Sequence, residues 1–318
     1  MDKKYQDKLF AKKAPLHVHI SITSDCNLKC IHCYGSYGII KKEIPFNILK
    51  KILAYYKKTN ILYVNISGGE PTKYSKFINL IKYLDHIELP YYLTSNGLFS
   101  LKKYNLIKKS KMLLAFKISL DGTNPQSHLY IRDPIKKNKK IYNNTLKTLN
   151  QLKKDEIYTI VGTLIHSKNY KEILEFPKFL NKLNVKKWII GPLLSKGRGK
   201  NNNKNINSNE IIKLFKDKKF IKKLNKECII NNIELDLSDF KTLDKKDYYF
   251  KCGAGIHYYH ISTNLIAYPC PLLPYTRFAK NYSYKIKNNL NNINKIWNSI
   301  QFKNWRIQQI KGCPDCKL

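Results

Sequence analysis

The order of apolar segments along the chain constrains its fold more than any other feature of the sequence. Six short runs rich in branched and aromatic residues are typical of β-strands, and they are Leu16–Thr23, Ile61–Ser67, Tyr91–Thr94, Leu113–Leu120, Tyr158–Leu164 and Lys187–Ile190. Five stretches with helical patterning separate them, at Pro45–Lys58, Lys73–His86, Leu101–Ser110, Tyr142–Lys153 and Tyr170–Leu183. This alternation predicts a parallel sheet with right-handed crossovers. Since eight such units close a full barrel, we expect an α/β fold built on an open, partial (β/α)6 TIM-like barrel.

The composition changes after the sixth predicted strand. Residues 195–199 (Ser-Lys-Gly-Arg-Gly) and the polar run that follows contain few apolar residues, which predicts a boundary. We expect the barrel over residues 1–200, a linker and helix over 201–251, and a small cysteine-rich module over 252–318. In the last two parts the sequence predicts a helix at Glu210–Asn231, a hairpin of Tyr258–Ile261 and Leu265–Tyr268, and a final helix at Ile293–Ile310.

Seven of the eight cysteines fall into two spaced groups. A disulfide framework suits small secreted chains, so metal or cluster ligation is the better interpretation. The first group is Cys26, Cys30 and Cys33, directly after the first predicted strand. Three thiolates leave one iron of a four-iron cluster without a protein ligand, as catalysis requires. The spacing alone also allows a zinc site with His32 as fourth ligand.

Polar and glycine-rich motifs follow the next three predicted strands. They contribute the candidate ligand-binding residues Gly68, Gly69, Glu70, Pro71, Ser95, Asn96, Ser119 and Asp121. Because the carboxyl ends of parallel strands meet at one edge of a sheet, these residues and the cysteine triplet are expected around one mouth. Paired glycines let backbone approach a ligand closely, and the side chains offer hydrogen bonds.

The second group of cysteines lies near the end of the sequence. It comprises Cys252, Cys270, Cys313 and Cys316. Four thiolates fully ligate a second cluster or a structural zinc, and the spacing does not decide between them. Cys228 belongs to neither group and lies on an apolar helix face, where we expect it to be buried.

Together these motifs resemble the radical S-adenosylmethionine (SAM) superfamily over nearly the whole chain. The resemblance implies that the triplet Cys26, Cys30 and Cys33 holds a catalytic [4Fe-4S] cluster with SAM beside it. It further implies the SAM contacts, namely the amino group at residues 68–71, the nucleoside at Ser95 and Asn96, the ribose at Ser119, and the carboxylate at Arg132. A bidentate arginine suits that carboxylate. His32 stands where the family usually has another aromatic residue, and its backbone is expected to contact the adenine.

The C-terminal part resembles a SPASM module in its shortened form, the twitch domain. The resemblance implies one auxiliary [4Fe-4S] cluster on the four cysteines of the second group. Leu265 stands where a glycine is usual, so the hairpin turn is expected to differ. In this family the cluster cleaves SAM to a 5′-deoxyadenosyl radical, which abstracts a substrate hydrogen, and an auxiliary cluster accepts the second electron. The sequence does not identify the catalytic base.

The resemblance implies an oxidative modification, and we favour peptide or protein maturation. Dehydrogenation of a small-molecule alcohol is the second hypothesis, and a zinc-stabilised RNA-binding protein is the third. Expected partners are a peptide or small-molecule substrate and an acidic electron donor such as a flavodoxin or ferredoxin. Only 25 residues precede Cys26, so a peptide substrate is expected to need a separate recognition protein or direct docking on the basic surface.

The chain is strongly basic, with 59 Lys and Arg against 22 Asp and Glu and a formal net charge of +37. Such a charge attracts nucleic acid or acidic proteins. The lysines are spread over nearly every helical segment, and Asn and Ile are overused with them, which favours an AT-rich coding bias over nucleic-acid binding. No apolar run is long enough to span a membrane or resembles a signal peptide, so we expect a cytoplasmic protein.

Overall fold

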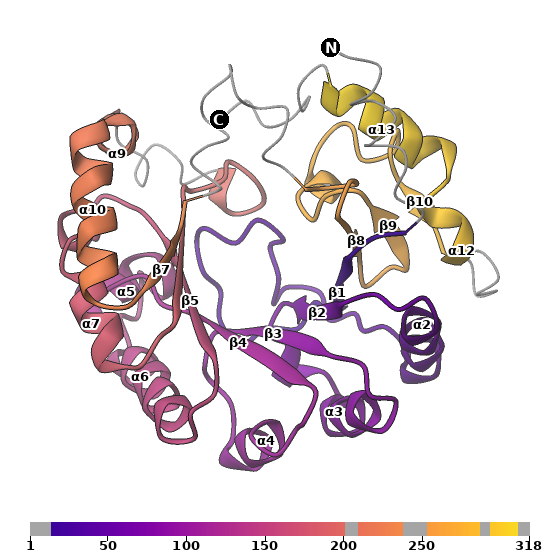
Figure 1. Ribbon diagram of the computed structural model, residues 1–318, viewed down its shortest axis with the longest axis horizontal. Helices are drawn as coiled ribbons and strands as arrows, with labels where there is room; N and C mark the ends of the chain where they lie inside the picture. Colours follow the sequence, from indigo (N-terminus) through magenta and orange to yellow (C-terminus); the bar gives the residue numbers. More distant parts are fainter. Residues whose placement is uncertain (1–13, 201–208, 238–252, 287–292, 311–318) are drawn as a thin grey trace.

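The computed structural model describes residues 14–200, 209–237, 253–286 and 293–310. Its centre is a curved sheet with the strand order β10-β9-β8-β1-β2-β3-β4-β5-β6-β7 (Figure 1). The strands are β1 (His17–Thr23), β2 (Tyr63–Gly68), β3 (Tyr91–Ser95), β4 (Leu113–Ser119), β5 (Thr159–Leu164), β6 (Lys187–Gly191), β7 (Glu234–Asp236), β8 (Tyr258–Ile261), β9 (Ile266–Tyr268) and β10 (Tyr284–Lys285). Neighbours from β8 through β1 to β7 are parallel, and β9 and β10 extend the sheet in antiparallel fashion. The partial barrel and its six predicted strands are confirmed.

Two parallel strands lengthen the sheet beyond the six that the sequence predicts. β7 is short and charged, and it pairs with β6. Lys187 Nζ on β6 lies 2.8 Å from Glu234 Oε1 and 3.4 Å from Asp236 Oδ2, so ion pairs join the two strands. β8 pairs with β1. In the part of the chain that the structure describes, β7 and β10 are the outer strands and do not pair with each other, which leaves the barrel open.

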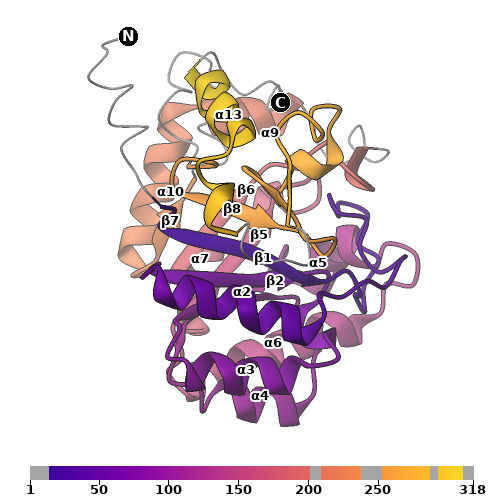
Figure 2. The same cartoon turned by 90° about the vertical axis from the view of Figure 1, so that its right-hand side faces the viewer.

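Helices cover the convex face of the sheet (Figures 1 and 2). The α-helices before β7 are α2 (Phe46–Lys58), α3 (Phe77–His86), α4 (Leu101–Ile107), α5 (Pro125–Arg132), α6 (Lys139–Lys154), α7 (Phe176–Lys182), α9 (Asn209–Lys216) and α10 (Lys218–Ile230). α2 shows why they pack there, because its buried residues Leu49, Ile52, Leu53 and Tyr56 recur on one face. This spacing gives an apolar stripe toward the core.

The structure corrects several predicted helices. The one expected from Lys73 begins at Phe77, after the 3-10 turn η1 (Pro71–Lys73). The helix expected over Tyr170–Leu183 divides into the turn η2 (Tyr170–Glu172) and α7. The helix expected over Glu210–Asn231 is two, because the Asp217 side chain accepts a hydrogen bond from the Lys219 N–H and starts α10 as an N-cap.

The two faces of the sheet differ in polarity because side chains alternate along each strand. On β1, Val18 and Ile20 are fully buried in the core under the helices. The intervening His17 stacks on Tyr63 of β2, with 4.6 Å between ring centroids, and on Tyr258 of β8 at 5.1 Å. Aromatic and polar side chains therefore line the concave face, which opens toward the carboxyl ends of the strands.

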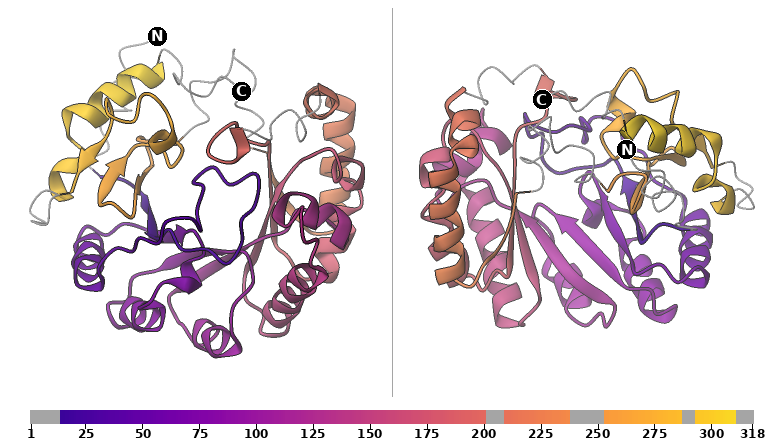
Figure 3. Two further views of the ribbon diagram at one scale, coloured as in Figure 1. Left: turned by 180° about the vertical axis from the view of Figure 1, so that it is seen from behind. Right: turned by 45° about the horizontal axis from the view of Figure 1, so that its top comes forward.

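The C-terminal residues continue the barrel wall at β1 (Figure 3). The predicted hairpin is confirmed as β8 and β9, and Leu265 adopts a φ of 56° in its turn, a conformation that favours glycine. The predicted final helix is two, α12 (Ile293–Ile296) and α13 (Ile300–Ile310), because the Ser299 hydroxyl accepts a hydrogen bond from the Phe302 N–H and caps α13. Trp305 Nε1 donates to the Ala254 carbonyl at 2.9 Å and anchors α13 beside β8.

The structure bears on the expected burial of Cys228 and on the expected absence of a membrane-spanning helix. Cys228 is buried on α10, as predicted. None of the helices in the described ranges has the length and apolarity needed to cross a membrane. The predicted boundaries near residues 200 and 252 stay predictions, and residues 201–208 and 238–252 lie outside the described residues.

Candidate functional site

The cysteine triplet forms one wall of a cavity at the carboxyl ends of the strands. Cys26, Cys30 and Cys33 all line this cavity of about 350 Å³. The loop that carries them turns back on itself through hydrogen bonds from the Cys33 N–H to the Cys30 carbonyl at 3.3 Å and from the Ser36 N–H to the Cys33 carbonyl at 3.2 Å. The three sulfurs are thus presented from one compact loop directly after β1.

Burial makes two of the three thiols weak acids. Burial raises the pKa of Cys26 to about 12 and that of Cys30 to about 11. Thiolates form at such positions when a metal displaces the proton. Among the described residues, no three His, Cys, Asp or Glu side chains meet closely enough to hold a single metal ion. The thiolates that hold a cluster need not meet at one ion, because a cluster spreads its ligands over several irons.

Glu70 braces the ends of β2 and β3 from within the fold. Its side chain is fully buried. Its carboxylate accepts hydrogen bonds from Ser95 Oγ and the Asn96 N–H, both at 2.9 Å, and from Thr72 Oγ1 at 2.7 Å. Burial raises the pKa of Glu70, and these hydrogen bonds oppose the rise. Neither Glu70 nor Pro71 is part of the cavity wall.

The two glycines before Glu70 line the cavity and let β2 pack against the cysteine loop. A Cβ at Gly68 would lie 2.2 Å from the Thr23 carbonyl oxygen, and one at Gly69 would lie 2.2 Å from that of Asp25. The Gly69 N–H also donates to the Thr23 carbonyl at 2.8 Å. The nearest neighbours of these glycines are therefore backbone atoms at the start of the cysteine loop, so their small size is needed for chain packing.

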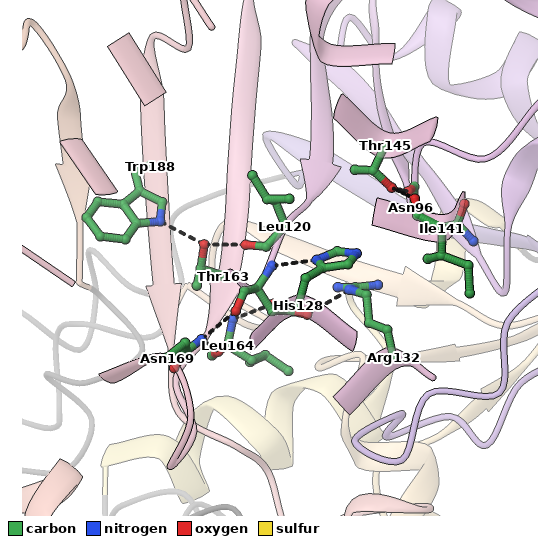
Figure 4. Close-up of polar contacts among 11 residues, drawn as sticks. Asn96, Leu120, His128, Arg132, Ile141, Thr145, Thr163, Leu164, Asn169 and Trp188 are labelled. Carbon is green, nitrogen blue, oxygen red and sulfur yellow. Dashed lines mark hydrogen bonds and ion pairs between the residues drawn. The ribbon is translucent and has the colours of Figure 1, made fainter. Parts of the chain in front are cut away.

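Asn96 reaches the cavity, but its amide also holds two loops together. Its Nδ2 donates to Asn27 Oδ1 at 2.7 Å, and its Oδ1 accepts from the Leu98 N–H at 2.9 Å. Thr145 Oγ1 on α6 donates to the Asn96 carbonyl at 3.2 Å (Figure 4). Ser95 lines the same wall. Both predicted residues are thus at the site.

A buried ion pair closes another side of the cavity. Arg132 Nε lies 2.7 Å from Asp121 Oδ2, with the Arg132 side chain 7% exposed and that of Asp121 0%. Asp121 Oδ1 accepts a hydrogen bond from the Leu164 N–H at 2.8 Å. Burial alone would raise the pKa of Asp121, but the Arg132 charge, acting together with His32, His128 and the Leu164 hydrogen bond, lowers that pKa. The pair is therefore charged, and it connects Arg132 on α5 to Leu164 on β5, both labelled in Figure 4.

Three histidines lie near this ion pair, with His128 and His166 fully buried and His32 half-buried. His128 lies one helical turn before Arg132 on α5, and its Nδ1 accepts from the Asp121 N–H at 3.1 Å. Burial, reinforced by the Arg132 charge, lowers the pKa of His32 to about 4 and that of His128 to about 3. Burial also lowers the pKa of His166 to about 4. All three rings are therefore neutral at physiological pH, and Arg132 is the cation beside them.

Three functional features escape the sequence predictions. α5 was not predicted, although Asn124 followed by Pro125 matches an N-cap with proline in the first turn. Lys117 lines the cavity from β4, two positions before Ser119 and on the same face. Gly162 on β5 leaves room for it, because a Cβ there would lie 2.7 Å from Lys117 Cε. The sequence signal for Lys117 is a lysine inside an apolar strand, two residues before Ser119 and therefore on the same face of the sheet.

The C-terminal cysteines are described only in part. Cys252, Cys313 and Cys316 lie outside the described residues, and Cys270 is half-buried just after β9. The Leu272 N–H lies 3.4 Å from Cys270 Sγ, and the Leu28 N–H makes a similar contact with Cys26. The ligand set of the second group stays a prediction.

The open parallel barrel and the three-cysteine loop at its mouth define the class of protein. Residues 20–180, just over half of the chain, match the family model described as "Radical SAM superfamily". This chain belongs to the radical SAM superfamily. Membership in this enzyme family sets aside the hypothesis of a zinc-stabilised RNA-binding protein.

Known proteins resemble different parts of the chain. GTP 3′,8-cyclase from Petrotoga mobilis is 36% identical over 118 residues, 35% of this chain and 36% of the relative. Mycofactocin maturase MftC from Mycolicibacterium smegmatis is 30% identical over 120 residues, 37% of this chain and 31% of the relative. The matches thus span about a third of these curated relatives.

A solved structure resembles nearly the whole fold. Streptococcus suis SuiB, bound to the precursor peptide SuiA, has a TM-score of 0.72 and 17% identity over 95% of this chain and 71% of that one. At that identity the likeness concerns the fold alone.

Proposed function

We propose that this chain binds a [4Fe-4S] cluster and SAM at the barrel mouth, cleaves SAM reductively and uses the resulting radical to modify a peptide. The observation that carries the proposal is that three thiols and the Arg132 guanidinium line one cavity of about 350 Å³. Three thiolates from Cys26, Cys30 and Cys33 leave one iron open for a substrate-like ligand. When bound, the reduced cluster and SAM supply a 5′-deoxyadenosyl radical, which abstracts a hydrogen atom from an unactivated carbon.

Arg132 is the proposed partner of the SAM carboxylate. In the described contact of its guanidinium, Arg132 Nε lies 2.7 Å from Asp121 Oδ2. This leaves Nη1 and Nη2, whose fork matches a carboxylate. Asp121 then acts by fixing the orientation of Arg132.

The remaining SAM contacts are proposed for the rest of the cavity wall. They are the amino group at Gly68 and Gly69, the nucleoside at Ser95 and Asn96, the ribose at Ser119, and the adenine at the His32 backbone. Glu70 and Pro71, which lie behind this wall, are proposed to act by shaping the loops that make it.

The second cysteine group is proposed to hold an auxiliary [4Fe-4S] cluster that accepts an electron from the substrate radical. Cys270 belongs to a segment that contacts the catalytic loop, since Tyr275 in the turn η4 (Leu273–Tyr275) donates from its hydroxyl to that of Tyr37 at 3.2 Å. A second cluster here would lie on the same side of the barrel mouth as the first. Cys252, Cys313 and Cys316 complete the proposed set of ligands.

A peptide is the favoured substrate because the likeness to a maturase and to a peptide-bound structure points the same way. A small molecule is the second candidate, supported by the 36% identity to a GTP 3′,8-cyclase. We propose an acidic flavodoxin or ferredoxin as electron donor, because a chain of net charge +37 attracts acidic proteins. A separate peptide-recognition protein is the further proposed partner.

Anaerobic turnover tests the proposal. Reconstituted protein given dithionite and SAM is expected to release 5′-deoxyadenosine, and Cys30→Ala is expected to abolish the release. Cys228→Ala is the matched control, because Cys228 is also buried but lies on α10 and does not line the cavity. Deoxyadenosine release that persists in Cys30→Ala would refute the assignment of the triplet.

A further inference from the structure

The segment after β6, which the sequence marks as a boundary, packs directly on the cysteine loop. Arg198 makes three hydrogen bonds to it. Its backbone N–H donates to the Cys33 carbonyl at 3.0 Å, its Nε to the Cys30 carbonyl at 2.8 Å, and its Nη1 to the Tyr37 carbonyl at 2.9 Å. One side chain thus joins a carbonyl inside the cysteine triplet to a carbonyl just after it.

The glycines on both sides of Arg198 make this approach possible. A Cβ at Gly197 would lie 2.2 Å from the Tyr34 carbonyl oxygen, and Gly197 has a φ of +52°. A Cβ at Gly199 would lie 2.5 Å from the Leu194 carbonyl oxygen and 3.4 Å from that of His32. Because backbone contacts this short exclude larger residues, the Gly-Arg-Gly sequence fits the cysteine loop specifically.

Other described hydrogen bonds reach the start and the end of the cysteine loop. Asn27 Nδ2 donates to the Leu98 carbonyl at 2.8 Å, Asn27 Oδ1 accepts from Asn96 Nδ2 at 2.7 Å, and the Tyr37 hydroxyl accepts from that of Tyr275 at 3.2 Å. Within the triplet, the Ile31 N–H donates to the Ile131 carbonyl at 2.9 Å. At the end of the loop, the Gly38 N–H donates to the Ser24 carbonyl at 2.9 Å. Hydrogen bonds from a charged donor are among the strongest in proteins. Arg198 also lines the cavity, so its side chain borders the same space as the three cysteines.

We propose that Arg198 is a positioning residue that holds the cysteine loop in its ligand-presenting shape and raises the reduction potential of the cluster bound there. The proposal rests on the proposed function, because it assumes that the triplet binds a cluster. The guanidinium fork fixes the spacing of two loop carbonyls. Its positive charge stabilises the added electron of a reduced cluster.

Two variants separate the geometric role from the electrostatic one. Arg198→Gln removes both charge and fork, whereas Arg198→Lys keeps the charge without the fork. Lys200→Gln is the matched control. Lys200 is exposed and lies two residues after Arg198, so this change also removes one positive charge. Each protein is studied as the full chain. Hydrogen exchange is measured on the protein without cluster. After reconstitution, the rate of iron release to a chelator and the reduction potential are measured.

In the apo protein, amide exchange over residues 26–38 is expected to speed up by about tenfold or more in Arg198→Gln and Arg198→Lys, and to stay unchanged in Lys200→Gln. After reconstitution, both Arg198 variants are expected to lose iron faster than wild type. The reduction potential is expected to fall in Arg198→Gln and to be largely restored in Arg198→Lys.

Two outcomes would overturn the proposal. One is wild-type exchange of the cysteine loop in Arg198→Gln, and the other is a reduction potential that shifts equally in Arg198→Gln and Lys200→Gln. A wild-type chain that binds no cluster would instead refute the proposed function, and the apo exchange result would still decide whether Arg198 holds the loop.

Discussion

Replacing Arg132 perturbs the ion pair on which the proposed SAM pocket depends. Arg132→Met keeps an unbranched apolar side chain in place of the arginine stem but removes the guanidinium, its charge and its contact with Asp121, 2.7 Å away. Asp121 is fully buried and would keep the Leu164 N–H as its side-chain donor. Removing one partner of a buried ion pair costs about 3–5 kcal/mol, because the other charge stays desolvated. We expect a loss of that size in the free energy of unfolding of the apo protein, measured with urea at pH 7.

The loss should depend on pH in a defined direction. In the wild type, burial raises the pKa of Asp121, but Arg132 together with the neighbouring histidines and the Leu164 hydrogen bond outweighs it, so that pKa lies below the ordinary value of 3.8. The stabilisation is therefore present above that value and is lost as pH falls through the folded-state pKa. In Arg132→Met, burial acts without the arginine and raises the pKa of Asp121. Protonation then relieves the buried charge, so the difference between the variant and the wild type should shrink as pH falls from 7 toward 4.

A double variant controls for lost packing. Asp121→Asn combined with Arg132→Met leaves no buried charge and keeps an acceptor for the Leu164 N–H. It should recover about 1–3 kcal/mol relative to Arg132→Met alone, the usual cost of an unpaired buried polar group. The reasoning is refuted if Arg132→Met unfolds within about 1 kcal/mol of wild type at pH 7, or if its deficit does not change with pH.

Three further predictions concern other parts of the site. Glu70→Gln should destabilise the fold by about 1–3 kcal/mol, because an amide meets several donors with one acceptor, whereas the exposed Glu88→Gln should leave the urea midpoint unchanged. Gly69→Ala should weaken SAM binding, measured by equilibrium dialysis of the reconstituted protein. The added Cβ would lie 2.2 Å from the Asp25 carbonyl oxygen and displace the cysteine loop. Unchanged affinity would show that the loop accommodates the methyl group. Cys270→Ala should lower iron from about eight to about four atoms per chain while SAM cleavage continues, and a wild type with four irons and one zinc would contradict the auxiliary cluster.

The barrel could be predicted because its strands carry their signal locally. Each of the six predicted strands is an apolar run bounded by polar residues, and β1 to β6 match them within a few positions. β7 carries no such signal. It consists of Glu234, Leu235 and Asp236, and its pairing with β6 is supported by ion pairs to Lys187, a partner distant in the sequence.

The site could be predicted as a set of residues but not as a set of contacts. Glu70 and Asp121 follow strands, as ligand-binding residues do, yet their carboxylates are engaged by Ser95 and Arg132 respectively. Which partner a buried carboxylate meets depends on how neighbouring loops cross. For the same reason Arg198, in a segment whose composition indicates a boundary, is a contact of the cysteine loop.

Electron paramagnetic resonance of the reduced protein reports whether the cluster on the cysteine triplet has an iron that is open to SAM. The Cys270→Ala variant simplifies the spectrum, because it is expected to retain only the cluster on Cys26, Cys30 and Cys33. We expect added SAM to change the signal of this cluster, since an iron without a protein ligand is open to SAM. A reduced cluster whose spectrum is the same with and without saturating SAM would contradict it.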